Sequence, residues 1–226
     1  MLNLMRLELM KFKMGSVIKG AFIAIFIAAI FLPLIMFDGE MNSYAIAFQF
    51  IDTFSRAVFM IFGASLIARF IIQEFQNKTM TVMFMYPINR KKMMIAKLLI
   101  IILFTLCTIV ISESVLFSFV YVLNLYHPVI LEPLTMSILV QNGAKLLVNA
   151  LAVTGISLIP LYFGMKKYSV RATFVSAIIV MFLVTSSLNG EISLFSFIVI
   201  PIILACVGLL IAYMAIRKIE QVDLFK

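Results

Sequence analysis

A few charged and amide side chains lie inside otherwise apolar runs of this sequence. Asp52 and Arg56 share one run, Glu113 lies in the next, and Lys145 and Asn149 lie in a third. If these runs cross a lipid bilayer, each ionised side chain costs roughly 2.5 to 3.5 kcal/mol at its centre even on lenient insertion scales. Such groups are therefore expected to face one another or water, and we predict that they line a substrate pathway.

The spacing of these groups indicates how they could pair. Asp52 and Arg56 stand four residues apart, so they lie on one face of a helix and can form an ion pair. Glu113 has no partner on its own helix, and we expect it to meet Arg56 or Lys145 across a helix contact. A purely structural clamp, or a position at the level of the lipid headgroups, is the alternative for each residue.

These runs contain no cluster of residues that could carry out catalysis. A membrane-embedded protease or lipid transferase needs clustered groups, such as paired acids or a serine with a histidine. The one histidine, His127, precedes Pro128 in a polar connection. Cys107 and Cys206 lie far apart in separate apolar runs, which favours small buried core residues over a metal site. We therefore expect no enzyme and no bound metal.

The elements that must position these residues are membrane-spanning helices. Of the 226 residues, 64% are apolar and 12% are charged, whereas soluble domains are usually about half apolar. We predict an all-α integral membrane protein with a single transmembrane domain over residues 1–226. Residues 1–16 are expected to form an amphipathic surface helix, with Met5, Leu9 and Phe12 on one face. The six predicted spans are 17–37, 44–72, 94–123, 137–164, 171–188 and 193–216.

The positions of the basic residues predict the orientation. Nearly all of the 18 Lys and Arg residues fall near the termini or in the connections after the second and fourth spans. The opposite connections, 38–43, 124–136 and 189–192, contain none. Cytoplasmic loops carry such an excess of Lys and Arg, so both termini are expected in the cytosol. The net charge of +8 is thereby explained without a nucleic-acid partner, because no block of five like charges exists.

The longest connection on the predicted cytosolic side, residues 73–93, has an unusual composition. An apolar stretch, Val82 to Met85, lies inside a polar frame, and Pro87 must end any helix before it. An exposed apolar patch in the cytosol indicates a protein partner or the membrane surface.

This connection carries a recognisable pattern. Glu74, Thr79, the turn from Pro87 to Arg90, and Lys97 follow one another in the order and spacing found in ABC-2 type permeases, the membrane subunits of ATP-driven transporters. The chain resembles in particular the permeases for bacitracin export, lantibiotic immunity and amphipathic-peptide export. Lys78 stands where a glycine is common in that family.

The resemblance implies a cytosolic coupling helix between the second and third spans, which docks on a separate ATPase. The coupling residues would be Glu74, Thr79, Phe84, Pro87, Arg90 and Lys97. The chain has no Gly-x-x-x-x-Gly-Lys-[Ser/Thr] phosphate loop, so ATP and Mg²⁺ are expected on the partner alone. The implied partners are an ABC ATPase dimer, a second permease copy or a different permease, and membrane lipids.

The resemblance also implies a substrate class and a location. It favours export of an amphipathic or apolar substrate, such as a peptide antibiotic or a lipid-like drug, across a bacterial plasma membrane. Two alternatives stay open. The connection could be an ordinary basic linker held by anionic headgroups, and the chain could be a secondary transporter or an accessory subunit of another complex.

Overall fold

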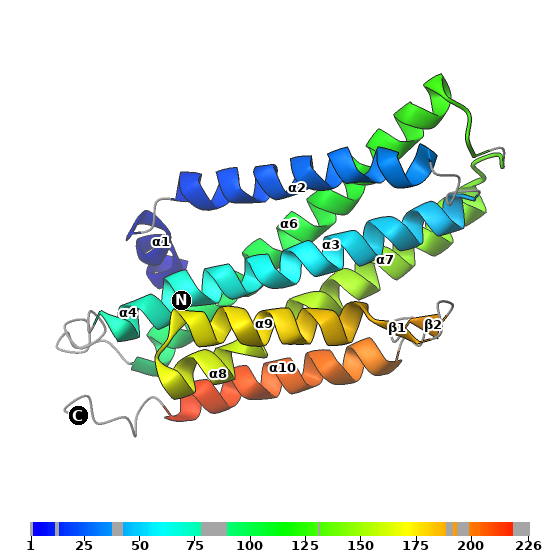
Figure 1. The fold of residues 1–226 in the computed structure, drawn as a ribbon. Coiled ribbons are helices and arrows are strands. Elements are labelled where there is room, and N and C mark those ends of the chain that lie inside the picture. Colours follow the sequence, from blue (N-terminus) through cyan, green and yellow to red (C-terminus); the bar gives the residue numbers. More distant parts are fainter. Residues whose placement is uncertain are drawn as a thin grey trace.

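The computed structural model describes residues 2–11, 14–37, 43–77, 90–130, 132–188, 192–193 and 199–218. A short N-terminal helix, α1, precedes a bundle of long helices that lie side by side (Figure 1). The first half contains α1 (Leu2–Lys11), α2 (Met14–Phe37), α3 (Tyr44–Ile67), η1 (Ala68–Ile72), α4 (Gln73–Gln76) and α6 (Arg90–Tyr126). The second half contains α7 (Met136–Ile156), α8 (Pro160–Lys167), α9 (Val170–Thr185), β1 (Ser187–Leu188), β2 (Ile192–Ser193) and α10 (Val199–Lys218).

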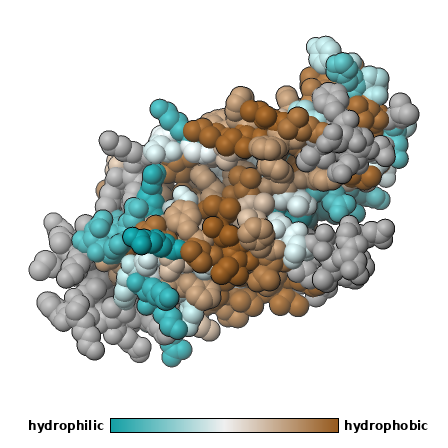
Figure 2. Space-filling model, in the orientation of Figure 1, coloured by the Kyte–Doolittle hydropathy of each residue, from teal (hydrophilic) through white to brown (hydrophobic). Residues whose placement is uncertain are grey.

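Five helical segments of the described chain are long and apolar enough to cross a membrane. A sixth apolar helix, α9, has 16 residues and is shorter. Hydrophobic side chains gather in the middle of the face seen in Figure 2, and hydrophilic side chains gather at its two ends. Such a belt matches the apolar core of a bilayer, which is about 30 Å thick. The protein is thus an all-α, multi-pass membrane protein.

The helix boundaries correct several of the predicted spans. The predicted span 137–164 is interrupted by a turn at residues 157–159, where Pro160 begins α8 without needing a backbone donor. The predicted span 171–188 ends earlier, because Ser187 and Leu188 pair as a strand with Ile192 and Ser193. For the same reason the last helix begins at Val199 and not at residue 193.

The α3 helix does not stop at the predicted residue 72. It passes through a π-helical turn, η1, and continues as α4 to Gln76. The α6 helix is also longer than predicted, with 37 residues. At 1.5 Å per residue it extends about 55 Å and must protrude from the bilayer or tilt within it.

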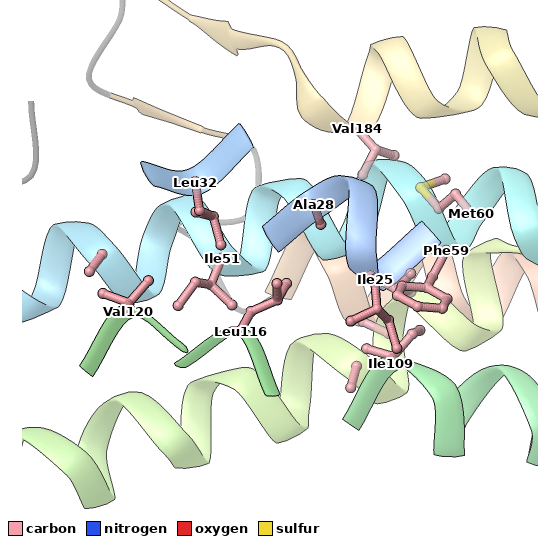
Figure 3. Close-up of a cluster of buried hydrophobic side chains, with 14 of the residues drawn as sticks. Ile25, Ala28, Leu32, Ile51, Phe59, Met60, Ile109, Leu116, Val120 and Val184 are labelled. Carbon is pink, nitrogen blue, oxygen red and sulfur yellow. The ribbon is translucent and has the colours of Figure 1, made fainter. Parts of the chain in front are cut away.

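Two clusters of apolar side chains hold the bundle together. In the first, Ile25, Ala28 and Leu32 from α2 pack against α3 and α6, where Ile51 and Leu116 are labelled in Figure 3. The second cluster lies around η1, α4 and the start of α6. Met5 and Leu9 of α1 pack against this second cluster, so the predicted apolar face of the N-terminal helix is confirmed for these two residues. Phe12 lies outside the described residues.

The closest helix contact joins α7 to α10 through glycine. A Cβ atom at Gly208 would collide with the backbone carbonyl of Gly155. A Cβ atom at Gly155 would in turn lie 2.7 Å from that of Ala205. Small residues of this kind let helix backbones approach closely inside a membrane, where burial from water provides no drive for packing.

The cysteines are placed differently from our expectation. Both Cys107 on α6 and Cys206 on α10 are exposed at the surface of the bundle. They belong to apolar helix faces that lipid would cover, so a small apolar side chain fits there as well as in a core.

Candidate functional site

Two clusters of buried charged residues stand out among the described residues. We call Glu8, Glu74 and Lys97 the junction cluster, because they come from α1, α4 and α6. We call Asp52, Arg56, Glu113 and Asn149 the α3 cluster, because two of the four lie on that helix.

The junction cluster is built around the ammonium group of Lys97. Its Nζ lies 2.6 Å from the Oε2 of Glu8 and 2.9 Å from the Oε2 of Glu74. Lys97 is 0% exposed, and both glutamates are buried. One cation thus joins two carboxylates that come from segments far apart in the sequence.

The local structure explains how these three side chains meet. The continuation of α3 through η1 into α4 carries Glu74 beyond the predicted span, toward the beginning of α6. Lys97 lies two turns after the start of α6. The α1 helix lies against α6, and Met5 and Leu9 pack in the second apolar cluster. Glu8 lies three residues from Met5 and next to Leu9, and it is buried with them. Such a buried ion pair requires good geometry, because removing charges from water costs several kcal/mol per ion.

The α3 cluster begins with the predicted ion pair on one helix face. Arg56 Nη2 lies 2.7 Å from Asp52 Oδ2, which confirms the pairing expected from the spacing. Asn149 of α7 donates a second hydrogen bond of 2.8 Å to the same carboxylate oxygen. Asp52 and Arg56 are both buried. The carboxylate is therefore held from its own helix and from α7.

Glu113 joins this cluster from α6. It is 5% exposed, and its charge interacts with those of both Asp52 and Arg56. The neighbouring Ser112 lies 3.3 Å from Ser55 through the two hydroxyl oxygens, which brings α6 against α3 at this level. No hydrogen bond or ion pair joins Glu113 to Arg56 among the described residues, so their expected pairing stays a prediction. Within the described part of the chain, no side chain donates a hydrogen bond or forms an ion pair with Glu113.

Lys145 does not enter the cluster. It is exposed on α7, one turn from Asn149, and forms no ion pair with the described residues. The pairing of Glu113 with Lys145, offered as an alternative, is therefore wrong. Of the two polar residues Lys145 and Asn149, only Asn149 forms a described hydrogen bond with α3.

Several predicted coupling residues cannot be placed. Thr79, Phe84 and Pro87 lie outside the described residues, and for Arg90 only its backbone position at the start of α6 is described. Glu74 and Lys97, the two ends of the pattern, are brought together.

Glu8 is the buried residue that the sequence analysis missed. It was assigned to a surface helix and given no role. One signal in the sequence could have identified it. Glu8 is the one acidic residue in residues 1–37, where the other charged residues are basic.

One comparison identifies a relative. The chain is 42% identical over 228 residues to uncharacterized protein YcbO from Bacillus subtilis (strain 168). The match covers 98% of this chain and 100% of the relative. No protein-family model and no solved structure matches the chain.

Proposed function

We propose that this chain, which belongs to the same family as the Bacillus subtilis protein YcbO, is the membrane subunit of an ATP-driven exporter of the ABC-2 type. A separate pair of ATPase subunits binds the connection between α4 and α6. The chain crosses the plasma membrane six times, with α9 as the shortest crossing, and both termini are cytosolic. Its substrate is amphipathic or apolar.

One observation carries this proposal, namely the contact between Glu74 and Lys97. These residues flank the connection that resembles a coupling element, and their side-chain atoms lie 2.9 Å apart in a buried site. An ordinary linker at the membrane surface needs no such tie at its base. A connection that transmits a movement of the ATPase does need such an ion pair, because the movement must displace α3 and α6 together.

The free energy of the buried ion pairs at Lys97 is large enough to hold α1, α4 and α6 rigidly together. Removing one partner from a buried ion pair typically costs about 3 to 5 kcal/mol, because the remaining charge stays buried without compensation. The three elements that meet at Lys97 therefore move as one unit unless a comparable free energy is supplied. ATP binding to a docked partner is a source of that size.

The distribution of charge supports the orientation in this proposal. The end of α10 lies at the same end of the bundle as α1 and α4 (Figure 1). Exposed basic residues occur at this end, among them Arg69, Lys166, Lys167 and Arg217. An excess of Lys and Arg marks the cytosolic side of membrane proteins.

The test is to purify the tagged chain from native membranes in mild detergent and to identify the proteins that accompany it. We expect an ATPase with a phosphate-binding loop in stoichiometric amount. The variants Phe84→Asp, Pro87→Ala and Arg90→Glu should lower its recovery at unchanged membrane levels of the chain. Glu132→Gln, in the connection at the far end of α6, serves as the matched control. An intact complex in all three variants would contradict the proposal.

A second candidate function rests on the interrupted helices. The turn at residues 157–159 breaks α7 from α8, and η1 interrupts α3. Secondary transporters place their ion sites at such breaks. Transport by the purified chain alone in proteoliposomes, driven by an ion gradient without ATP, would favour this function over the first.

A further inference from the structure

We propose that Glu113 is the binding site for a positively charged ammonium group of the transported substrate. The role as a substrate site rests on the proposed transport function. The binding itself is a property of this chain and can be measured without the ATPase.

The charges of the α3 cluster do not balance. The α3 cluster contains two carboxylates, Asp52 and Glu113, and one guanidinium, Arg56. When all three are ionised, the cluster carries a net charge of −1. Among the described residues, no further cation pairs with the cluster. Lys145 on α7 is exposed and forms no ion pair, and Lys19 on α2 and Arg171 on α9 lie in the half of their helix nearer α1 and α4.

Geometry decides which carboxylate carries the excess charge. Asp52 Oδ2 already receives hydrogen bonds from Arg56 at 2.7 Å and from Asn149 at 2.8 Å. Glu113 is 5% exposed and receives neither a hydrogen bond nor an ion pair from the described residues. A buried carboxylate without a direct partner is the group that a cation of the substrate would contact.

The junction cluster shows how two buried carboxylates are compensated when a cation of the chain itself contacts both. There, too, two carboxylates accompany one cation, but Lys97 contacts both at 2.6 and 2.9 Å. At the α3 cluster the guanidinium is committed to Asp52, and the second carboxylate is left for a ligand. An ammonium group on a substrate would provide Glu113 with the contact that Lys97 provides to Glu8 and Glu74.

The chemistry of the surroundings specifies the rest of the ligand. Phe117 lies one turn from Glu113 on α6 and stacks on Phe48 of α3 with ring centroids 4.5 Å apart. Aromatic faces attract cations and also accept alkyl chains. The ligand class is therefore an amphipathic cation, with an ammonium head at Glu113 and an apolar body along the helices.

The experiment uses the full chain in lipid nanodiscs, without the ATPase. Because the chain contains no tryptophan, Phe117→Trp introduces a single tryptophan one turn from Glu113, whose fluorescence can be excited selectively. The probe is dodecyltrimethylammonium, whose charge does not depend on pH. Dodecyl maltoside and dodecyl sulfate are the neutral and anionic probes with the same alkyl chain. We expect saturable binding of the cationic probe, at least about tenfold tighter than that of the neutral probe, which corresponds to about 1.4 kcal/mol.

Four variants in this background test the role of charge. Glu113→Gln should weaken binding of the cationic probe at least about tenfold, again about 1.4 kcal/mol. Glu113→Asp should stay within a few-fold, and Glu132→Gln should have no effect. Asp52→Asn keeps Glu113 but frees Arg56 to neutralise it, so this variant should also lose the preference for the cation.

The outcomes separate this inference from the transport proposal. Equal affinity of Glu113→Gln for the cationic probe, or equal binding of the neutral probe to the unchanged cluster, would overturn the ammonium site. Should Glu113→Gln fail to fold, Asp52→Asn and Glu113→Asp still decide the question. Cation binding without a copurifying ATPase would leave the site standing and refute the ABC-type function.

Discussion

The two charged clusters contain the same charges in different arrangements. At the junction cluster, one lysine lies between two glutamates from separate elements. At the α3 cluster, the arginine pairs with an aspartate on its own helix, and the second carboxylate lies nearby without direct contact. The first arrangement is held by two direct ion pairs and suits a rigid joint. The second has one carboxylate, Glu113, without a hydrogen bond or ion pair to any described residue, and it suits a site that receives a ligand.

The largest effect is expected from Lys97→Met, which removes the shared cation of the junction cluster. Two buried carboxylates would face each other without compensation, at a cost of about 3 to 5 kcal/mol. The chain should lose most of its folded form in detergent, measured by size exclusion and thermal unfolding. Lys167→Met, an exposed lysine at the same end of the bundle, is the matched control. A stable Lys97→Met protein would remove the basis for the rigid joint.

Glu8→Gln is a milder change at the same cluster. Lys97 keeps Glu74 as a partner, so the expected loss in the free energy of unfolding is about 2 kcal/mol. The effect should be strongly non-additive with that of Lys97→Met, because the two residues contact each other. Thermal unfolding of the single and double variants measures the coupling. Additive effects would show that α1 is not held through this ion pair.

Asn149→Ala removes the contact between α7 and the ion pair on α3. Asp52 keeps Arg56, so we expect a loss of about 1.5 kcal/mol, the value typical of a hydrogen bond to a charged group. The change should be detected as a lower midpoint of thermal unfolding. Asn142→Ala removes an amide two turns earlier on α7 that donates a hydrogen bond to the backbone of its own helix, and it provides the comparison. An equal effect of the two variants would indicate that the contact with Asp52 contributes nothing specific.

Glu113→Gln should differ most clearly from Glu8→Gln, because the two substitutions should change the free energy of unfolding in opposite directions. Removing an uncompensated carboxylate from an apolar region relieves its burial cost, and we expect a gain of about 1 kcal/mol in the absence of a cationic ligand. The two glutamine variants should be compared in the same detergent by thermal unfolding. Destabilisation by both substitutions would mean that Glu113 already has a strong partner and that the two clusters are alike.

The α3 cluster shows which side-chain contacts could be predicted from the sequence. The i, i+4 spacing of Asp52 and Arg56 predicted their ion pair correctly, since a helix fixes the distance between such neighbours. The spacing could not show that Asn149 would join them, because that contact depends on how α7 packs against α3. The rejected pairing of Lys145 with Glu113 depended on the same unknown packing.

Helix boundaries were predicted less well than the existence of the helices. Composition identifies an apolar run, but the turn at residues 157–159, the π turn of η1 and the strand pair after α9 interrupt or shorten such runs locally. The turn at residues 157–159 lies where two helices pack closely, because a Cβ atom at Gly63 of α3 would lie 2.8 Å from that of Ser157. Hydropathy carries no information about that contact.

By itself, the sequence determined that the chain is helical and crosses a membrane several times. Apolar runs of this length have no other stable solution in lipid, where each backbone group must be bonded within its own helix. Only the tertiary structure decided that Glu8 would meet Lys97, at a separation of 89 residues. It also decided that Glu113 would be buried on α6 at the level where the neighbouring Ser112 meets Ser55 of α3. The position of a charge along one helix follows from local geometry, whereas its partner on another helix depends on the packing of the whole bundle.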